Sequence, residues 1–84
     1  MESNQRLKSA IIQVVDNQIE ANDPPETNQT LARLIAEGFS ESAAKELLGT
    51  VVLAEVFTVL SKGEAFDLDR YVVALNRLPQ PPQG

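Results

Sequence analysis

This chain of 84 residues contains neither cysteine nor histidine, so its twelve carboxylates are the main residues able to carry chemistry. Those two absences remove the commonest zinc ligands and the commonest general base at neutral pH. They also exclude disulfides and thiolate metal sites. We therefore expect a protein that is not an enzyme and that needs no metal or other cofactor.

Two polar residues, Gln18 and Glu55, fall within apolar stripes and form the candidate buried polar pair. Gln18 lies in line with Leu7 and Ile11, and Glu55 lies in line with Leu48. If the two helices that carry these stripes pack together, the Gln18 amide can donate a hydrogen bond to the Glu55 carboxylate. That bond would satisfy an acid whose isolated burial is costly.

The surroundings of Glu55 have three interpretations. Because the apolar stripe of its helix has rotated by position 55, our first expectation is that Glu55 faces water while Leu53 and Phe57 face the core. The second interpretation keeps Glu55 buried and hydrogen-bonded to Gln18. The third is catalysis by Glu55, since a buried acid can have a raised pKa.

Other carboxylates suggest a metal site without forming a motif. Asp67 and Asp69 lie close together, but their stretch lacks the alternating ligands, central glycine and terminal glutamate of an EF-hand loop. Capping of a helix explains Asp67 better. The alternative function that stays open is a carboxylate-based metal-binding domain, or a degenerate metal-dependent enzyme, that uses Asp16, Glu46 and Glu55.

The elements that must position these residues are helices, because helical spacing of apolar residues runs through most of the chain. We expect helices over residues 3–21, from the Pro24-Pro25 pair to Gly38, over residues 41–62 and over residues 68–78. The fold class is all-α, a compact four-helix, bundle-like domain in which the long third helix is central. Residues 1–78 form the single domain, and residues 79–84 form a flexible proline-rich tail.

The two adjacent prolines predict a corner between helices rather than a recognition motif. Proline disfavours helical geometry in the residue before it, yet fits the first turn of a new helix. Asp23 is the expected N-cap of the second helix, and Glu26 completes a variant of the capping box. Ser40 and Asp67 are the expected N-caps of the third and fourth helices.

The third helix changes its apolar face as it proceeds, which is typical of a helix packed against different neighbours along its length. Gly49, in its interior, indicates a close approach of another backbone. If the second apolar face is not covered by the chain itself, it becomes an interface for self-association. The candidate interface residues are Leu53, Val56, Phe57 and Leu60.

The charge pattern limits the partners. The net charge is −5, and the seven basic residues are scattered along the chain, so we expect no nucleic acid and no membrane as a partner. No apolar run is long enough to span a bilayer, and the first residues lack the pattern of a secretory signal, which predicts a cytoplasmic protein. A lesser possibility is that the acidic surface occupies a basic partner, as a nucleic-acid mimic does.

A family resemblance joins several of these segments. DNQ at residues 16–18, DPPE at 23–26, LARLIAEG at 31–38 and FDLDRYVVALNRLP at 66–79 occur in an order and spacing that resemble the DUF1841-type domains. These are short bacterial helical proteins of unknown function, and the similarity covers residues 12–79. The resemblance implies a fold more than an activity.

This chain departs from that family at the positions that suggest a metal site. Many DUF1841-type domains carry histidines on the first helix and around the start of the third. Ile12 stands at the first of these positions, and Ser42 and Glu46 stand at the others. We therefore expect a small non-enzymatic interaction module that binds itself, as a homodimer, or another protein.

Overall fold

The computed structural model describes residues 2–82, with side chains from residue 5 onward, and this part of the chain is all-α. Its four helices are α1 (Glu2–Ala21), α2 (Pro25–Ala36), α3 (Glu41–Lys62) and α4 (Leu68–Arg77), and α3 is the longest. No strand occurs between residues 2 and 82. The predicted four-helix, bundle-like domain with a long third helix is therefore confirmed.

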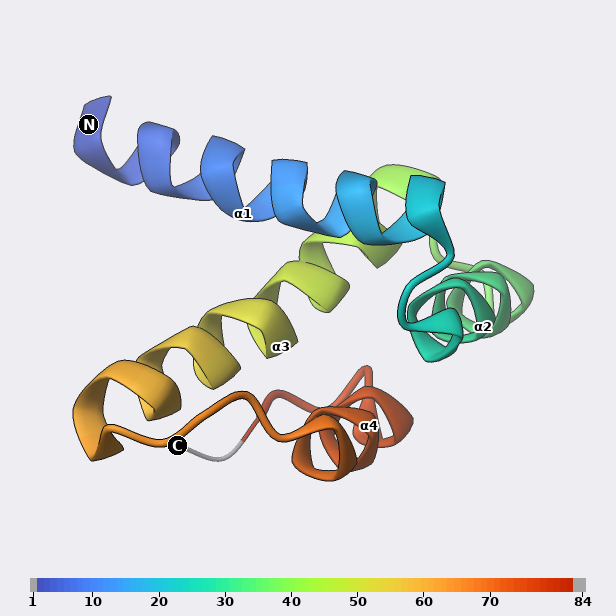
Figure 1. Cartoon of the computed structure of the whole chain (residues 1–84). Helices are drawn as coiled ribbons and strands as arrows, with labels where there is room; N and C mark the ends of the chain where they lie inside the picture. The colour runs from blue at the N-terminus through green and yellow to red at the C-terminus, as the bar shows by residue number, and fades with distance from the viewer. Residues whose placement is uncertain (1, 83–84) are drawn as a thin grey trace.

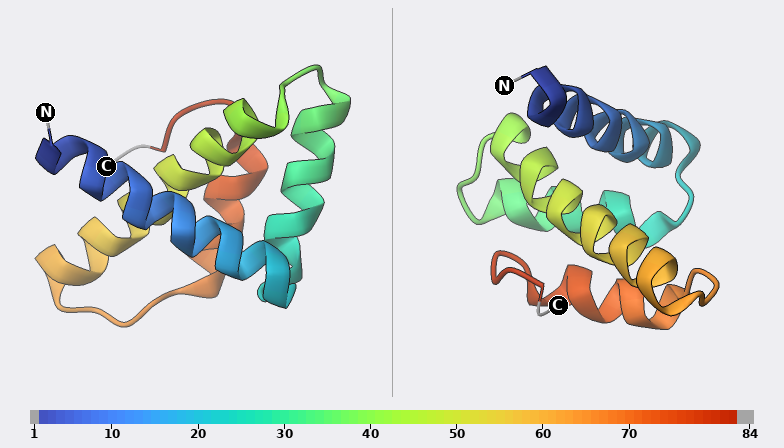
Figure 2. Two further views of the ribbon diagram at one scale, coloured as in Figure 1. Left: turned by 90° about the horizontal axis from the view of Figure 1, so that it is seen from above. Right: turned by 90° about the vertical axis from the view of Figure 1, so that its left-hand side faces the viewer.

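Both α2 and α3 pack against all three other helices, and α3 is the longer and central one. Helix α3 runs between α1 on one side and α4 on the other, and α2 closes one end of the molecule (Figures 1 and 2). Away from that end, the N-terminal half of α1 and the C-terminal half of α3 diverge (Figure 1). The molecule thus has a closed end next to α2 and an open end opposite.

The core lies at the closed end and draws on all four helices. Its apolar members are contributed mostly by α3 and α4 and are less than a tenth exposed. They are Val15, Leu34, Ala44, Leu48, Val51, Val52, Tyr71, Leu75 and Leu78. Four of them, Ala44, Leu48, Val51 and Val52, come from the first part of α3.

Gly49 marks the place where α1 crosses α3. A Cβ atom built on this buried glycine would lie 3.1 Å from Ile11 Cγ2 and 3.9 Å from Ile12 Cδ1. The first distance is shorter than ordinary van der Waals contact. A close neighbour is therefore present at Gly49, but it consists of the Ile11 and Ile12 side chains of α1 and not of another backbone.

The corner between α1 and α2 is built differently from the prediction. The N-cap of α2 is Pro24, and no side chain caps it, so the expected cap by Asp23 and capping box with Glu26 are wrong. Instead, Asn28 Nδ2 donates to Ile19 O (3.0 Å) and to Asn22 Oδ1 (2.9 Å), which ties α2 back to the end of α1. The proline pair therefore lies at a corner between helices, as predicted, and the Asn28 amide satisfies acceptors at the C-terminal end of α1.

The N-caps of α3 and α4 and the end of α3 agree with the predictions from the sequence. Ser40 accepts a hydrogen bond from Ala43 N (3.1 Å), and Asp67 accepts one from Arg70 N (3.1 Å). Gly63 ends α3 with φ +65°, in the left-handed region that glycine adopts without strain. Both predicted N-caps are thereby confirmed.

The described part of the proline-rich tail turns back on the helices. Gln80 N donates to Arg77 O (2.9 Å), and the half-buried Pro82 lines a hollow between α3 and α4. The prediction of a flexible tail also covers Gln83 and Gly84, which lie outside the described residues. Leu78, the last residue of the predicted domain, is buried.

Candidate functional site

Glu55 is buried in an ion pair with Arg70, so the first expectation, that it faces water, is wrong. Only 7% of Glu55 is exposed. Arg70 Nη2 donates to Glu55 Oε2 (2.6 Å) and Arg70 Nε donates to Glu55 Oε1 (2.9 Å). This two-point contact between a planar guanidinium and a carboxylate is the strongest geometry for such a pair.

The pair is part of a small network at the junction of α3 and α4. The backbone N–H of Asp67 also donates to Glu55 Oε2 (3.1 Å), and Arg70 Nη1 donates to Glu64 Oε1 (3.2 Å). The hydrogen bonds from Arg70 hold the pKa of Glu55 below its ordinary value although burial acts in the opposite direction. The Glu55 carboxylate is therefore ionised at neutral pH.

This arrangement makes Glu55 a structural group. A general acid needs a proton at neutral pH, and the lowered pKa removes it. Both carboxylate oxygens already accept hydrogen bonds from Arg70, which leaves little capacity for a substrate. The network instead fixes the segment from Gly63 to Asp67 against α3, so that α4 returns along it.

Gln18 belongs to a second polar cluster and has other partners than Glu55. Thr27 Oγ1 donates to Gln18 Oε1 (2.9 Å), and the Tyr71 hydroxyl donates to the same oxygen (2.8 Å). Among the hydrogen bonds of the described residues, none joins Gln18 to Glu55. The predicted pairing is therefore wrong, although Gln18 does satisfy buried polar groups.

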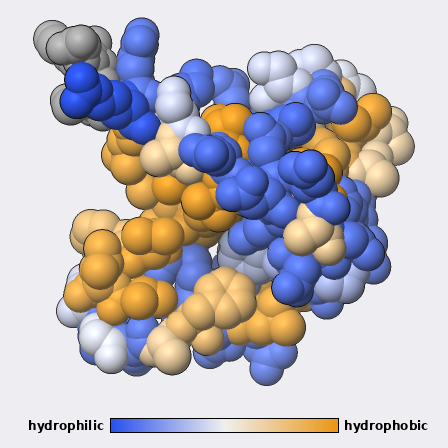
Figure 3. Space-filling model, turned by 45° about the horizontal axis from the view of Figure 1, so that its top comes forward, coloured by the Kyte–Doolittle hydropathy of each residue, from blue (hydrophilic) through white to orange (hydrophobic). Residues whose placement is uncertain are grey.

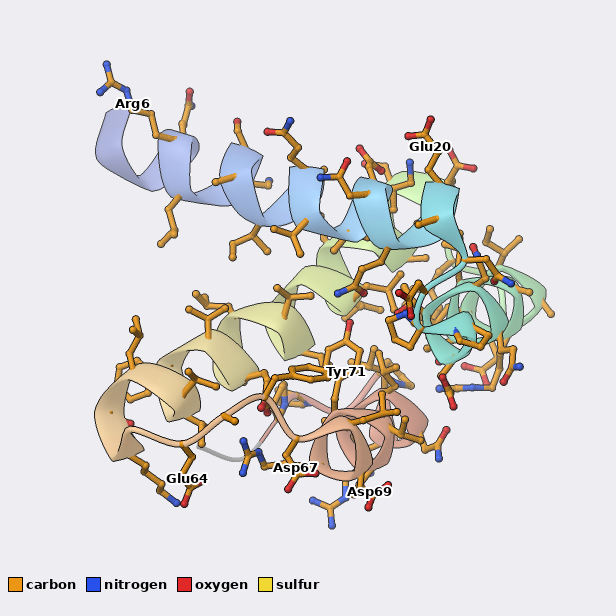
Figure 4. All side chains as sticks on the ribbon, viewed as in Figure 1. Arg6, Glu20, Glu64, Asp67, Asp69 and Tyr71 are labelled. Carbon is orange, nitrogen blue, oxygen red and sulfur yellow. The ribbon has the colours of Figure 1, made fainter. Side chains whose placement is uncertain are left out.

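Tyr71 lies between the two clusters. Its side chain points from α4 toward α1 and α3, whereas the nearby Glu64 and Asp69 lie at the outer edge of the molecule (Figure 4). Burial raises the pKa of the Tyr71 phenol above its ordinary value, and the hydrogen bonds with Thr27 and Gln18 act in the opposite direction. The Gln18 cluster thus connects α1, α2 and α4 through one oxygen atom.

The carboxylates proposed for a metal site lie in separate ion pairs. Asp16 Oδ1 is 2.9 Å from Lys45 Nζ, and Glu46 pairs with Lys8. Glu55, the third candidate, is held by Arg70. Within residues 5–82 no three His, Cys, Asp or Glu side chains are placed to hold one metal ion. The arrangement of these carboxylates thus does not favour the metal-binding alternative.

The second apolar face of α3 lies at the open end and is largely uncovered. The exposed fractions are 41% for Leu53, 42% for Val56, 70% for Phe57 and 79% for Leu60. We call these four residues the α3 ridge. They are the candidate interface residues, and apolar side chains dominate this region of the molecular surface (Figure 3). The expectation that Leu53 and Phe57 face the core is wrong.

An apolar groove runs beside the ridge, where α1 and α3 begin to diverge. Its volume is about 330 Å³, and residues from both helices line it. The lining residues are Leu7, Lys8, Ile11 and Ile12 from α1, and Glu46, Gly49, Thr50 and Leu53 from α3. We call this hollow the α1–α3 groove.

The groove contains two of the positions singled out by the family resemblance. Ile12 and Glu46, which the resemblance predicts to stand at histidine positions, both line it, and Ser42 is exposed on the first turn of α3. Comparisons with protein-family models, with curated proteins and with solved structures gave no match to this chain. The resemblance therefore stays a prediction. None of the described helices is both long and apolar enough to cross a bilayer.

Sequence reasoning missed the residues that complete the two polar clusters. Arg70 was one of seven scattered bases, and neither Thr27 nor Tyr71 stood out as a partner of Gln18. A signal for Arg70 exists, because a turn at Gly63 folds α4 back along α3 and brings a base near Glu55. No comparable local signal connects Gln18 with Tyr71, since 53 residues separate them.

Proposed function

We propose that this protein is a small non-enzymatic interaction module that associates with itself through the α3 ridge. The observation that carries the proposal is the exposure of four large apolar side chains on one face of the central helix. Contiguous exposed apolar surface of this kind is typical of protein interaction sites in soluble domains. The cytoplasmic location predicted from the sequence is part of the proposal.

The polar clusters support a binding role over a catalytic one. Glu55 and Gln18 have their hydrogen-bonding capacity directed at other side chains of the same chain. The acids Asp16 and Glu46 are paired with lysines. What the ridge offers to a partner is therefore mainly apolar area, which favours association between proteins.

Solution mass tests this proposal. We expect light scattering across a concentration series to show a rise from monomer to dimer for the unmodified chain. Phe57→Glu places a charge in the middle of the ridge, so it should hold the mass at that of the monomer. Circular dichroism should show an unchanged helix content, because Phe57 is 70% exposed within one chain.

Ile35→Glu is the matched control. Ile35 is also an exposed apolar residue, but it lies on α2, at the closed end of the molecule. We expect this variant to associate as the unmodified chain does. An unmodified chain that stays monomeric at millimolar concentration would refute self-association, and equal weakening by both variants would refute the assignment to the ridge.

A further inference from the structure

We infer that the partner of the α1–α3 groove is Phe57 of a second copy of this chain, in a two-fold symmetric and reciprocal contact. The inference rests on the proposed self-association and adds to it the surface that receives the ridge. Each copy would supply one projecting Phe57 and one groove. Two such contacts then form in every dimer.

Ridge and groove adjoin on one face of the molecule, as a reciprocal contact requires. Leu53 is a member of the ridge and also lines the groove. Phe57 follows it by four residues, one turn further along α3, on the same side of the helix. In a contact between identical surfaces, residue i of one copy meets residue j of the other and the reverse. Two copies facing each other across a two-fold axis can therefore place each ridge over the other copy's groove.

The charges of α3 favour a second copy over a charged partner. Between Thr50 and Ser61 the only ionisable side chain is Glu55, and Arg70 holds it in a buried pair. The exposed side of this segment thus carries no charge that would select an acidic or basic partner. Because this side is apolar, the same side of a second copy complements it. The net charge of −5 repels a second copy only at long range.

The available area fits a small specific interface. The five most relevant exposed side chains are Leu7, Leu53, Val56, Phe57 and Leu60, between 41% and 79% exposed. Together they offer on the order of 500 Å² per copy. Two copies would then bury about 1,000 Å², which is the lower limit for a specific protein interface.

The groove is large enough for an aromatic ring. Its volume is about 330 Å³, and a cavity of about 150 Å³ in a protein interior accepts a benzene molecule. The remaining space suits the neighbouring ridge residues. Because the lining is mainly aliphatic, a phenyl ring would bury its apolar surface there without leaving a polar group unpaired.

A charge placed in the groove tests the inference separately from the proposed function. Thr50 lines the groove, is exposed and is not part of the ridge. Thr50→Arg should weaken self-association about tenfold or more, because Phe57 of the second copy would meet a charge. Gln13→Arg is the matched control, since it adds the same charge to an exposed position of α1 that does not line the groove. Circular dichroism should show the same helix content for both.

The decisive measurement is the mass of an equimolar mixture of Thr50→Arg and Phe57→Glu. At a concentration where neither variant dimerises alone, the mixture should recover the dimer mass. In the mixed dimer, one contact keeps Phe57 in an unaltered groove, and the other places the new carboxylate against the new guanidinium. When Gln13→Arg is mixed with Phe57→Glu, the mass of the mixture should not rise above the average of the two variants measured separately.

Three results would overturn the inference. If Phe57→Glu abolishes the dimer and Thr50→Arg does not, the ridge is an interface but the groove is not its partner. A mass that keeps growing beyond the dimer would indicate an open chain of copies instead of a closed two-fold contact. A monomeric unmodified chain would remove the proposed function and the inference together.

Discussion

The two halves of α3 are both rich in apolar residues, yet their surroundings are opposite. At the closed end, Leu48 and Val51 are fully enclosed by the other three helices, whereas at the open end Phe57 and Leu60 are 70% and 79% exposed. The difference arises because α1 crosses α3 at Gly49 and then diverges from it. Apolar composition alone therefore does not identify the core of this domain.

Glu55 marks the boundary between the two ends. It is the one charged residue on the buried side of α3, and Arg70 from α4 neutralises it. Beyond this point α4 and the preceding loop cover one side of α3, while the ridge residues stay between 41% and 79% exposed. An ion pair thus ends the core at the point where the described part of the chain has no further helix to continue it.

The largest expected effect is a deletion at the closed end. Leu48→Ala removes part of a fully buried side chain and should lower the free energy of unfolding by about 2 to 5 kcal/mol, because it loses burial and leaves a cavity. Leu60→Ala, at the open end, should change the unfolding free energy of the monomer by no more than about 0.5 kcal/mol. Urea unfolding at low protein concentration measures both.

The same two variants should behave in the opposite way in association. Leu60→Ala should weaken the dimer measured by light scattering, because Leu60 belongs to the ridge. Leu48→Ala should leave the dimer intact at temperatures where the chain stays folded. A loss of more than about 1 kcal/mol from Leu60→Ala in the monomer would instead show that the open end is packed within one chain.

A smaller effect on the free energy of unfolding is expected for Glu55, at the boundary between the two ends, and this effect depends on pH. The pKa of Glu55 is lower in the folded chain than its ordinary value of 4.5, so the folded state gains stability from Glu55 above that pH. This gain is lost as the pH falls through the folded pKa. The difference in unfolding free energy between the unmodified chain and Glu55→Gln should therefore be constant near neutral pH and shrink below about pH 4.5.

Denaturant unfolding between pH 3 and pH 7 measures this difference. Asp69→Asn is a suitable control, because Asp69 is exposed and lies next to the network without bonding Glu55. Its difference from the unmodified chain should vary less over the same range. A Glu55→Gln difference that stays constant down to pH 3 would contradict the assigned role of the pair.

The smallest expected effect comes from the Gln18 cluster. Tyr71→Phe removes the hydroxyl that donates to Gln18 Oε1, while Thr27 remains as the second donor. We expect Tyr71→Phe to lower the free energy of unfolding by about 1 kcal/mol, the usual net value of one hydrogen bond. The pKa of Tyr71 is raised above 10.0 in the folded chain, so the difference in unfolding free energy between the unmodified chain and the variant should become smaller as the pH rises beyond 10. Thermal unfolding at pH 7 and pH 11 measures both parts.

The sequence was sufficient for features that depend on neighbouring residues. Helical periodicity predicts four helices, and the side chains of Ser40 and Asp67 cap two of them because a cap needs only the next turn. Gly49 indicates the close approach of another helix without naming it. The failure at Asp23 is also local, because Pro24 takes the cap position and has no side chain that can accept a hydrogen bond.

The tertiary structure alone decided which polar and apolar groups meet. The pairing of Glu55 with Arg70 depends on the return of α4 along α3, and the contact of Gln18 with Tyr71 joins residues that are 53 positions apart. Exposure of the α3 ridge likewise depends on the angle at which α1 leaves Gly49. The spacing of apolar residues predicted the helices because it is a local property, whereas the relative placement of the helices, and with it the exposed surface, comes from side-chain packing over the whole chain.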